Sequence, residues 1–168
     1  MDAVYVDFLS KLAATLIGAL VGVLGGFWLD RRQVESKQKK EGKAILEALH
    51  NELSHDSSLL NQMCDELPNG VIFYNLDLST WQATTGKQLE SLRNYELVRR
   101  ISGMYYEFQH LNRKVDVQFE IHFSSTRTFS RYSDLRREIV GPILVHAAEL
   151  QPHLVKLISD IKVEVEKL

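Results

Sequence analysis

The stretch LAATLIGALVGVLGGFWL, residues 12–29, contains no charged residue and dominates the fold that the sequence predicts. At about 1.5 Å rise per residue, a helix of this length measures about 27 Å, close to the roughly 30 Å of a hydrocarbon core. The acidic start MDAVYVD and the bulky residues that end the run are unlike those of a cleaved signal peptide. We therefore expect a retained transmembrane helix.

Small residues recur at every fourth position of this run, at Ala14, Gly18, Gly22 and Gly26. The spacing places them on one stripe of a helix, where neighbouring backbones approach closely. The stripe predicts self-association into a homo-oligomer. The alternative is that these glycines reflect only the general enrichment of glycine in membrane helices.

Basic residues follow the apolar run, whereas acidic residues Asp2 and Asp7 precede it. This bias predicts a protein of the cell inner membrane, with its N-terminus outside and its larger part cytoplasmic. We expect three parts: an anchor at 1–30, a basic connector at 31–43 that meets anionic headgroups, and a cytoplasmic domain at 44–168. The basic residues are Arg31, Arg32, Lys37, Lys39, Lys40 and Lys43.

Composition narrows the range of partners. The chain has 168 residues with 20 basic and 22 acidic side chains, a net charge of −2, so we expect no DNA as a partner. Cys64 is the single cysteine. It forms no intrachain disulfide, which agrees with a reducing compartment and excludes a redox site built from two cysteines.

Apolar residues spaced by three and four predict a long helix from about 34 to 67, which Pro68 and the following turn residues end. The segment VIFYNLDL then forms an extended connector. Ser79 and Gln82 have the spacing of a capping box, which favours a short helix from 80 to 92 with Trp81 buried. The expected core residues of the long helix are Leu46, Leu49, Leu53, Leu60, Met63 and Leu67.

Two more helices are predicted, from 95 to 123 and from 129 to the C-terminus, the second kinked or split by Pro142 and Pro152. The fold class is therefore all-α: one transmembrane helix followed by an antiparallel helical bundle of the four-helix type. The first seam is Val98, Ile101, Tyr105, Phe108, Asn112, Val115 and Phe119. The second is Ile139, Ile143, Leu150, Leu154, Leu157, Ile161, Val165 and Leu168.

Three Glu-x-x-His pairs invite a metal site: Glu47 with His50, Glu52 with His55, and Glu107 with His110. Di-metal bundles need such pairs on two inward faces, and here the third pair faces away from its seam. We therefore expect no metal and no cofactor. The sequence has no phosphate loop and no catalytic signature, so we do not expect an enzyme.

The strongest candidate ligand site is SSTRTFSRYSDLRR, residues 124–137, at a predicted helix start. Helix N-termini and guanidinium groups bind phosphate, and an aromatic ring can stack on a base. An anionic nucleotide is the ligand that this chemistry favours, with a polar loop that merely caps the helix as the alternative. The candidate residues are Ser125, Thr126, Arg127, Arg131 and Tyr132.

The exit WLDRRQ, the helix LEALHNELSHDSSLLNQM and the later Trp81, Tyr105 and Asn112 resemble the pattern of a broad class of small prokaryotic single-pass membrane proteins. That resemblance implies a cytoplasmic helical bundle more than an activity. Size and layout are also similar to the CRISPR-associated membrane effectors that a cyclic oligonucleotide gates.

The leading hypothesis is a self-associating membrane protein whose bundle senses or recruits a partner or ligand. One alternative is an antiviral effector that an anionic cyclic nucleotide gates at Arg127 and Arg131, and that permeabilises the membrane. The other is a passive membrane anchor or assembly factor.

Overall fold

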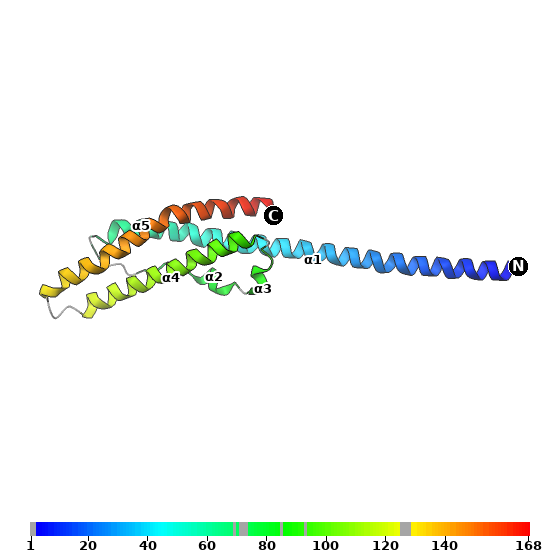
Figure 1. Ribbon diagram of the computed structural model, residues 1–168, viewed down its shortest axis with the longest axis horizontal. Coiled ribbons are helices and arrows are strands. Elements are labelled where there is room, and N and C mark those ends of the chain that lie inside the picture. Colours follow the sequence, from blue (N-terminus) through cyan, green and yellow to red (C-terminus); the bar gives the residue numbers. More distant parts are fainter. Residues whose placement is uncertain (1–2, 69, 71–73, 85, 93, 125–128) are drawn as a thin grey trace. The chain divides into compact units, whose positions relative to one another are not determined.

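A computed structural model describes residues 3–68, 70, 74–84, 86–92, 94–124 and 129–168, with the backbone alone described for 3–14, 16, 17, 87, 124 and 129–136. These residues form helices and connecting segments and contain no strand. The all-helical character predicted from the sequence is thus confirmed. The helices are α1 (Ala3–Glu66), α2 (Ser79–Ala83), α3 (Gly86–Leu89), α4 (Tyr95–Ser124) and α5 (Phe129–Lys167) (Figure 1).

The chain divides into two compact units, residues 1–40 and residues 41–168. Helix α1 supplies the described part of the first unit and, from Glu41 onward, one long helix of the second. The second unit also contains α2 to α5 and holds the hydrophobic core. We call this second unit the bundle.

The predicted transmembrane helix at 12–29 is wrong. In the part of the chain that the structure describes, no helix combines the length and the apolar character that crossing a membrane requires. Charged residues begin at Asp30, directly after the apolar run, and continue with Arg31, Arg32 and Glu35. Glycines 18, 22, 25 and 26 also contribute little apolar surface. The predicted inner-membrane location is a separate claim and stays a prediction.

Three seams of alternating three- and four-residue spacing build the core of the bundle. Such spacing keeps one stripe of each helix facing its neighbours over several turns. The structure confirms all six core residues predicted for α1 and places Ile143, Leu150, Leu154, Leu157 and Ile161 of α5 in the core. Helix α5 stays continuous through Pro142 and Pro152, so it is not split. It changes direction between its orange and red parts (Figure 1).

Most of the predicted seam of α4 is confirmed, since Ile101 and Val115 are among its buried residues, but one end is wrong. Phe119, expected inside, is 39% exposed, whereas Leu97, Met104 and Leu111 are buried. The buried set follows a 3.5-residue repeat from Leu97 to Val115, and Phe119 falls outside that repeat. Asn112, Tyr105 and Phe108 are buried as predicted.

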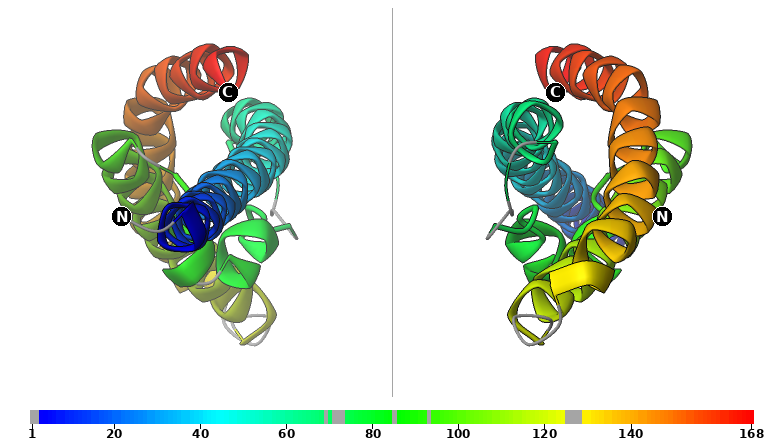
Figure 2. Two further views of the ribbon diagram at one scale, coloured as in Figure 1. Left: turned by 90° about the vertical axis from the view of Figure 1, so that its right-hand side faces the viewer. Right: turned by 90° about the vertical axis from the view of Figure 1, so that its left-hand side faces the viewer.

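The antiparallel arrangement holds only in part, because α1 and α4 run parallel within the bundle (Figure 1). Glu52 of α1 bonds to Tyr105 of α4, and Leu46, earlier on α1, lines the same small hollow as Leu97. Helix α5 is antiparallel to both: Arg100 of α4 pairs with Asp160 at 2.7 Å, and the C-terminal part of α5 lies beside α1 (Figure 2). The connection 67–94 returns the chain to the end where α1 enters the bundle.

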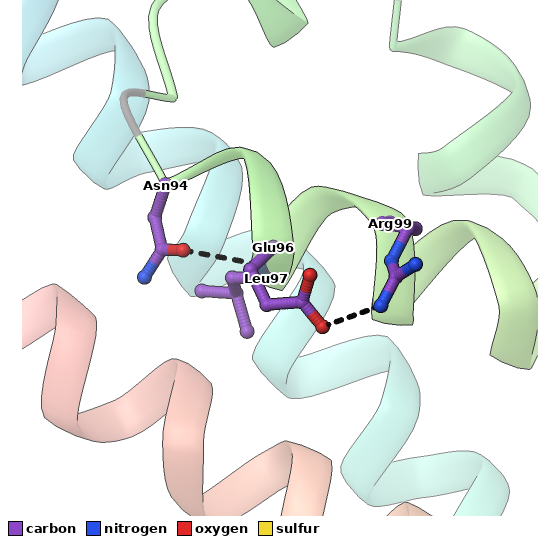
Figure 3. A network of polar contacts seen from close by, with 4 residues as sticks. All are labelled: Asn94, Glu96, Leu97 and Arg99. Atoms are coloured by element: carbon purple, nitrogen blue, oxygen red, sulfur yellow. Dashed lines mark hydrogen bonds and ion pairs between the residues drawn. The ribbon is translucent and has the colours of Figure 1, made fainter.

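The single short helix predicted at 80–92 is two helices, α2 and α3. The capping box is also wrong, since the N-cap residue of α2 is Leu78, which makes no side-chain cap, and the Ser79 hydroxyl donates to Glu52 instead. Helix α4 does have a side-chain cap: Oδ1 of Asn94 accepts the Leu97 N–H at 3.1 Å (Figure 3). In the same turn Arg99 pairs with Glu96 at 2.9 Å.

Candidate functional site

The predicted anionic-ligand site lies largely outside the described residues. Ser125, Thr126 and Arg127 belong to 125–128, which the structure does not describe. Arg131 and Tyr132 are in the first turn of α5, and the structure describes their backbone alone. This site therefore stays a prediction.

The glycine stripe belongs to α1. Gly18, Gly22 and Gly26 are exposed, and a Cβ built on each meets nothing within 4 Å; of Ala14 only the backbone is described. The large apolar side chains of the run are exposed as well, Phe27 by 76% and Trp28 by 57%. The others are Leu20, Val21, Val23, Leu24 and Leu29. We call residues 18–29 the apolar segment.

A cationic stretch follows the apolar segment directly. The Arg32 guanidinium carbon lies 4.4 Å from the centroid of the Trp28 ring, a cation–π contact. Leu29, Arg32, Gln33, Ser36, Lys37 and Lys40 line one surface of the helix. Arg31 pairs with Glu35 at 3.6 Å on another side.

Inside the bundle, a polar cluster surrounds Glu52. Its Oε1 accepts the Tyr105 hydroxyl at 2.6 Å, and its Oε2 accepts the Thr80 N–H at 2.6 Å and the Ser79 hydroxyl at 3.2 Å. Because Glu52 is 7% exposed, these three donors replace water around its carboxylate. Burial, and then the Glu52 hydrogen bond, raise the pKa of Tyr105. The half-buried Trp81, predicted as a buried anchor, stacks on Tyr105 with 5.2 Å between ring centroids.

Asp56 lies one turn further along α1 and is fully buried. Its Oδ1 accepts the Asp77 N–H at 2.8 Å, whereas its Oδ2 has no hydrogen-bond partner. Burial raises the pKa of Asp56 from 3.8 to about 7; the Asp77 N–H opposes this rise and nearby Glu52 adds to it. The two carboxylates thus hold the backbone of residues 77–80 against α1.

Asn112 of α4 holds the same connection from the other side. Its Oδ1 accepts the Leu76 N–H at 2.9 Å, and its Nδ2 donates to the Leu76 carbonyl at 3.0 Å. Next to this contact, Asn75 donates to Asp116 at 3.1 Å. Side chains of α1 and α4 therefore supply hydrogen-bond partners for residues 75–80, which belong to no strand. Because Glu52, Asp56 and Asn112 are buried and bonded to backbone groups of residues 76–80, the cluster fixes the connection against α1 and α4.

The third Glu-x-x-His pair, Glu107 with His110, makes two separate contacts. Glu107 accepts from Nε2 of His146 at 3.0 Å, and Nδ1 of His146 accepts from Lys114 at 3.1 Å. His110 packs edge-on against Tyr106. Among the described residues, no group of three or more histidine, cysteine, aspartate or glutamate side chains is arranged to hold a metal ion.

The sequence contained a signal for the Glu52 and Asp56 cluster. Asp56 occupies a seam position of α1, between Leu53 and Leu60, where an apolar residue is expected. A carboxylate in such a seam indicates a buried partner, but the sequence does not identify backbone groups from 77–80 as that partner. Comparison with known protein families, curated proteins and solved structures found no match for this chain.

Proposed function

We propose that the chain is a non-enzymatic assembly protein whose copies associate through the apolar segment, while the bundle serves to recruit a partner. The observation that supports this function is the exposure of seven consecutive or near-consecutive large apolar side chains, from Leu20 to Leu29. A large exposed apolar patch marks an interaction surface, because contact between apolar side chains and water is unfavourable in free energy.

The size of the segment is sufficient for association. Burying one large apolar side chain contributes about 1.5–3 kcal/mol, so the segment offers on the order of 10–20 kcal/mol for each copy that is covered. Association of two proteins costs about 4–15 kcal/mol in lost freedom of motion. The gain therefore offsets the cost when most of the segment is covered.

The glycine spacing favours a second copy as the occupant. Gly18, Gly22 and Gly26 form a shallow stripe that is open in the single chain, and Leu20, Leu24 and Phe27 form a ridge on the opposite face of the helix. A glycine stripe of one helix receives the ridge of another with the backbones close together, so one sequence provides both halves of the contact.

The test is the mass of the full-length protein in a mild non-ionic detergent, measured by light scattering after size exclusion. We compare the natural protein with Gly22→Leu and with Gly103→Leu. Gly103 is the matched control, since it is an exposed helical glycine of α4 at which an added Cβ also meets nothing within 4 Å.

We expect a defined oligomer for the natural protein and for Gly103→Leu, and a smaller species for Gly22→Leu. A monomer in all three samples refutes self-association. The same oligomer in all three shows that copies associate elsewhere, and it refutes the role of the glycine stripe.

A further inference from the structure

The cationic stretch of α1, residues 30–43, carries a net positive charge, whereas the rest of the chain carries a net negative charge. Residues 30–43 hold six basic and three acidic side chains, a surplus of three positive charges. Because the whole chain carries −2, the remainder carries −5. Every residue from 30 to 41 is exposed. Attraction to an anionic partner is therefore local to this stretch, and the remainder of the chain is repelled by the same partner.

Three of the cations share one surface of the helix with an apolar side chain. Arg32, Lys37 and Lys40 share one surface with Leu29. At the N-terminal end of that surface, Arg32 lies over the exposed Trp28 ring. A polyanion such as nucleic acid pairs with the cations but leaves the exposed Trp28 and Leu29 uncovered. A lipid surface covers both, since tryptophan takes the headgroup level and basic residues contact the phosphates.

We propose that residues 28–40 of α1 bind the surface of a membrane that contains anionic phospholipids. Trp28 and Leu29 contact the acyl boundary, and Arg32, Lys37 and Lys40 contact lipid phosphates. The glycine stripe and the ridge of Leu20, Leu24 and Phe27 are not part of this contact, so it does not depend on self-association.

The test is flotation of the full-length protein with vesicles of phosphatidylcholine alone and vesicles of phosphatidylcholine mixed with phosphatidylserine. The test variant is Arg32→Gln with Lys37→Gln and Lys40→Gln. The matched control is Arg113→Gln with Lys156→Gln and Lys162→Gln, which removes the same charge from exposed positions of the bundle.

We expect the natural protein and the control to prefer the anionic vesicles, and the preference to weaken as salt is added. Each cation near an anionic surface is worth about a fivefold change in affinity, so the test variant should bind those vesicles about a hundredfold more weakly. Equal binding to both vesicle types overturns the proposal. So does an equal loss in the test and control variants, or capture by soluble polyphosphate without any binding to vesicles.

Trp28→Ala separates the apolar contribution from the charge. If the segment touches the acyl boundary, this substitution lowers binding to both vesicle types by a similar factor and leaves the preference for anionic lipid in place. Unchanged binding of Trp28→Ala overturns the assignment of that side chain to the boundary.

Discussion

The buried Asp56 predicts that the bundle becomes less stable as the pH rises through the neutral range. Its pKa is 3.8 in the unfolded chain and about 7 in the fold, because burial disfavours the carboxylate. Between these values the folded state holds a proton that the unfolded state has released, so the free energy of unfolding falls with increasing pH. A shift of this size corresponds to about 4 kcal/mol, fully lost above pH 7.

Asp56→Asn keeps an oxygen for the Asp77 N–H and removes the charge. We expect the stability of this variant relative to the natural protein to increase by about 4 kcal/mol between pH 4 and pH 8. The change with pH is diagnostic because any constant cost of fitting an amide nitrogen in place of the unpartnered Oδ2 cancels.

Urea unfolding measures this difference, followed by fluorescence of Trp81. Both chains carry Trp28→Phe, which leaves Trp81 as the one tryptophan. Asp65→Asn, an exposed aspartate of the same helix, is the control and should follow the natural protein at every pH. A constant difference between Asp56→Asn and the natural protein across this range would refute the assignment of a proton to Asp56.

Three further substitutions test the packing, each by urea unfolding. Tyr105→Phe removes a 2.6 Å donor from the buried Glu52 carboxylate and should cost about 1.5–3 kcal/mol, whereas Tyr106→Phe on the exposed side should cost less than about 0.5 kcal/mol. Asn112→Ala leaves both polar groups of Leu76 unpaired and should cost about 2–4 kcal/mol; a smaller loss would mean that water replaces the amide. Gly103→Ala should stabilise the protein by about 0.5–1 kcal/mol, because alanine favours the helix more than glycine does. Gly42→Ala should not give this gain, because the added Cβ meets the Ser91 carbonyl oxygen at 3.2 Å. Equal gains at both sites would contradict this packing.

Hydrophobic periodicity predicted the long helices of the bundle because their cores are regular. The end of α1 near Pro68 and the limits of α4 follow from turn residues and from the three-to-four spacing. The direction of α4 relative to α1 did not follow, since it depends on how the connection 67–94 crosses the bundle. Contacts such as Asn112 with Leu76 decide that crossing, and they join residues far apart in the sequence.

The apolar run at 12–29 shows the limit of predicting a transmembrane helix from composition alone. An uncharged run of this length satisfies a simple count of residues, but among the described residues no helix is long and apolar enough to cross a membrane. The Glu52 and Asp56 cluster was missed for another reason. Glutamate and aspartate on a helix usually face water, and only the position of Asp56 in the seam argued otherwise.

The parallel course of α1 and α4 has a consequence for how the bundle forms. Helices α4 and α5 are neighbours in sequence, and the contact of Lys114 with His146 between them spans 32 residues, whereas Glu52 meets Tyr105 across 53 residues and Ser57 meets Gln151 across 94. Distant contacts form slowly, because a longer loop must close first. We therefore expect the α4–α5 hairpin to fold early and α1 to dock last. During synthesis, α1 is thus complete, with its apolar segment accessible, well before the helices that enclose its C-terminal half have been made.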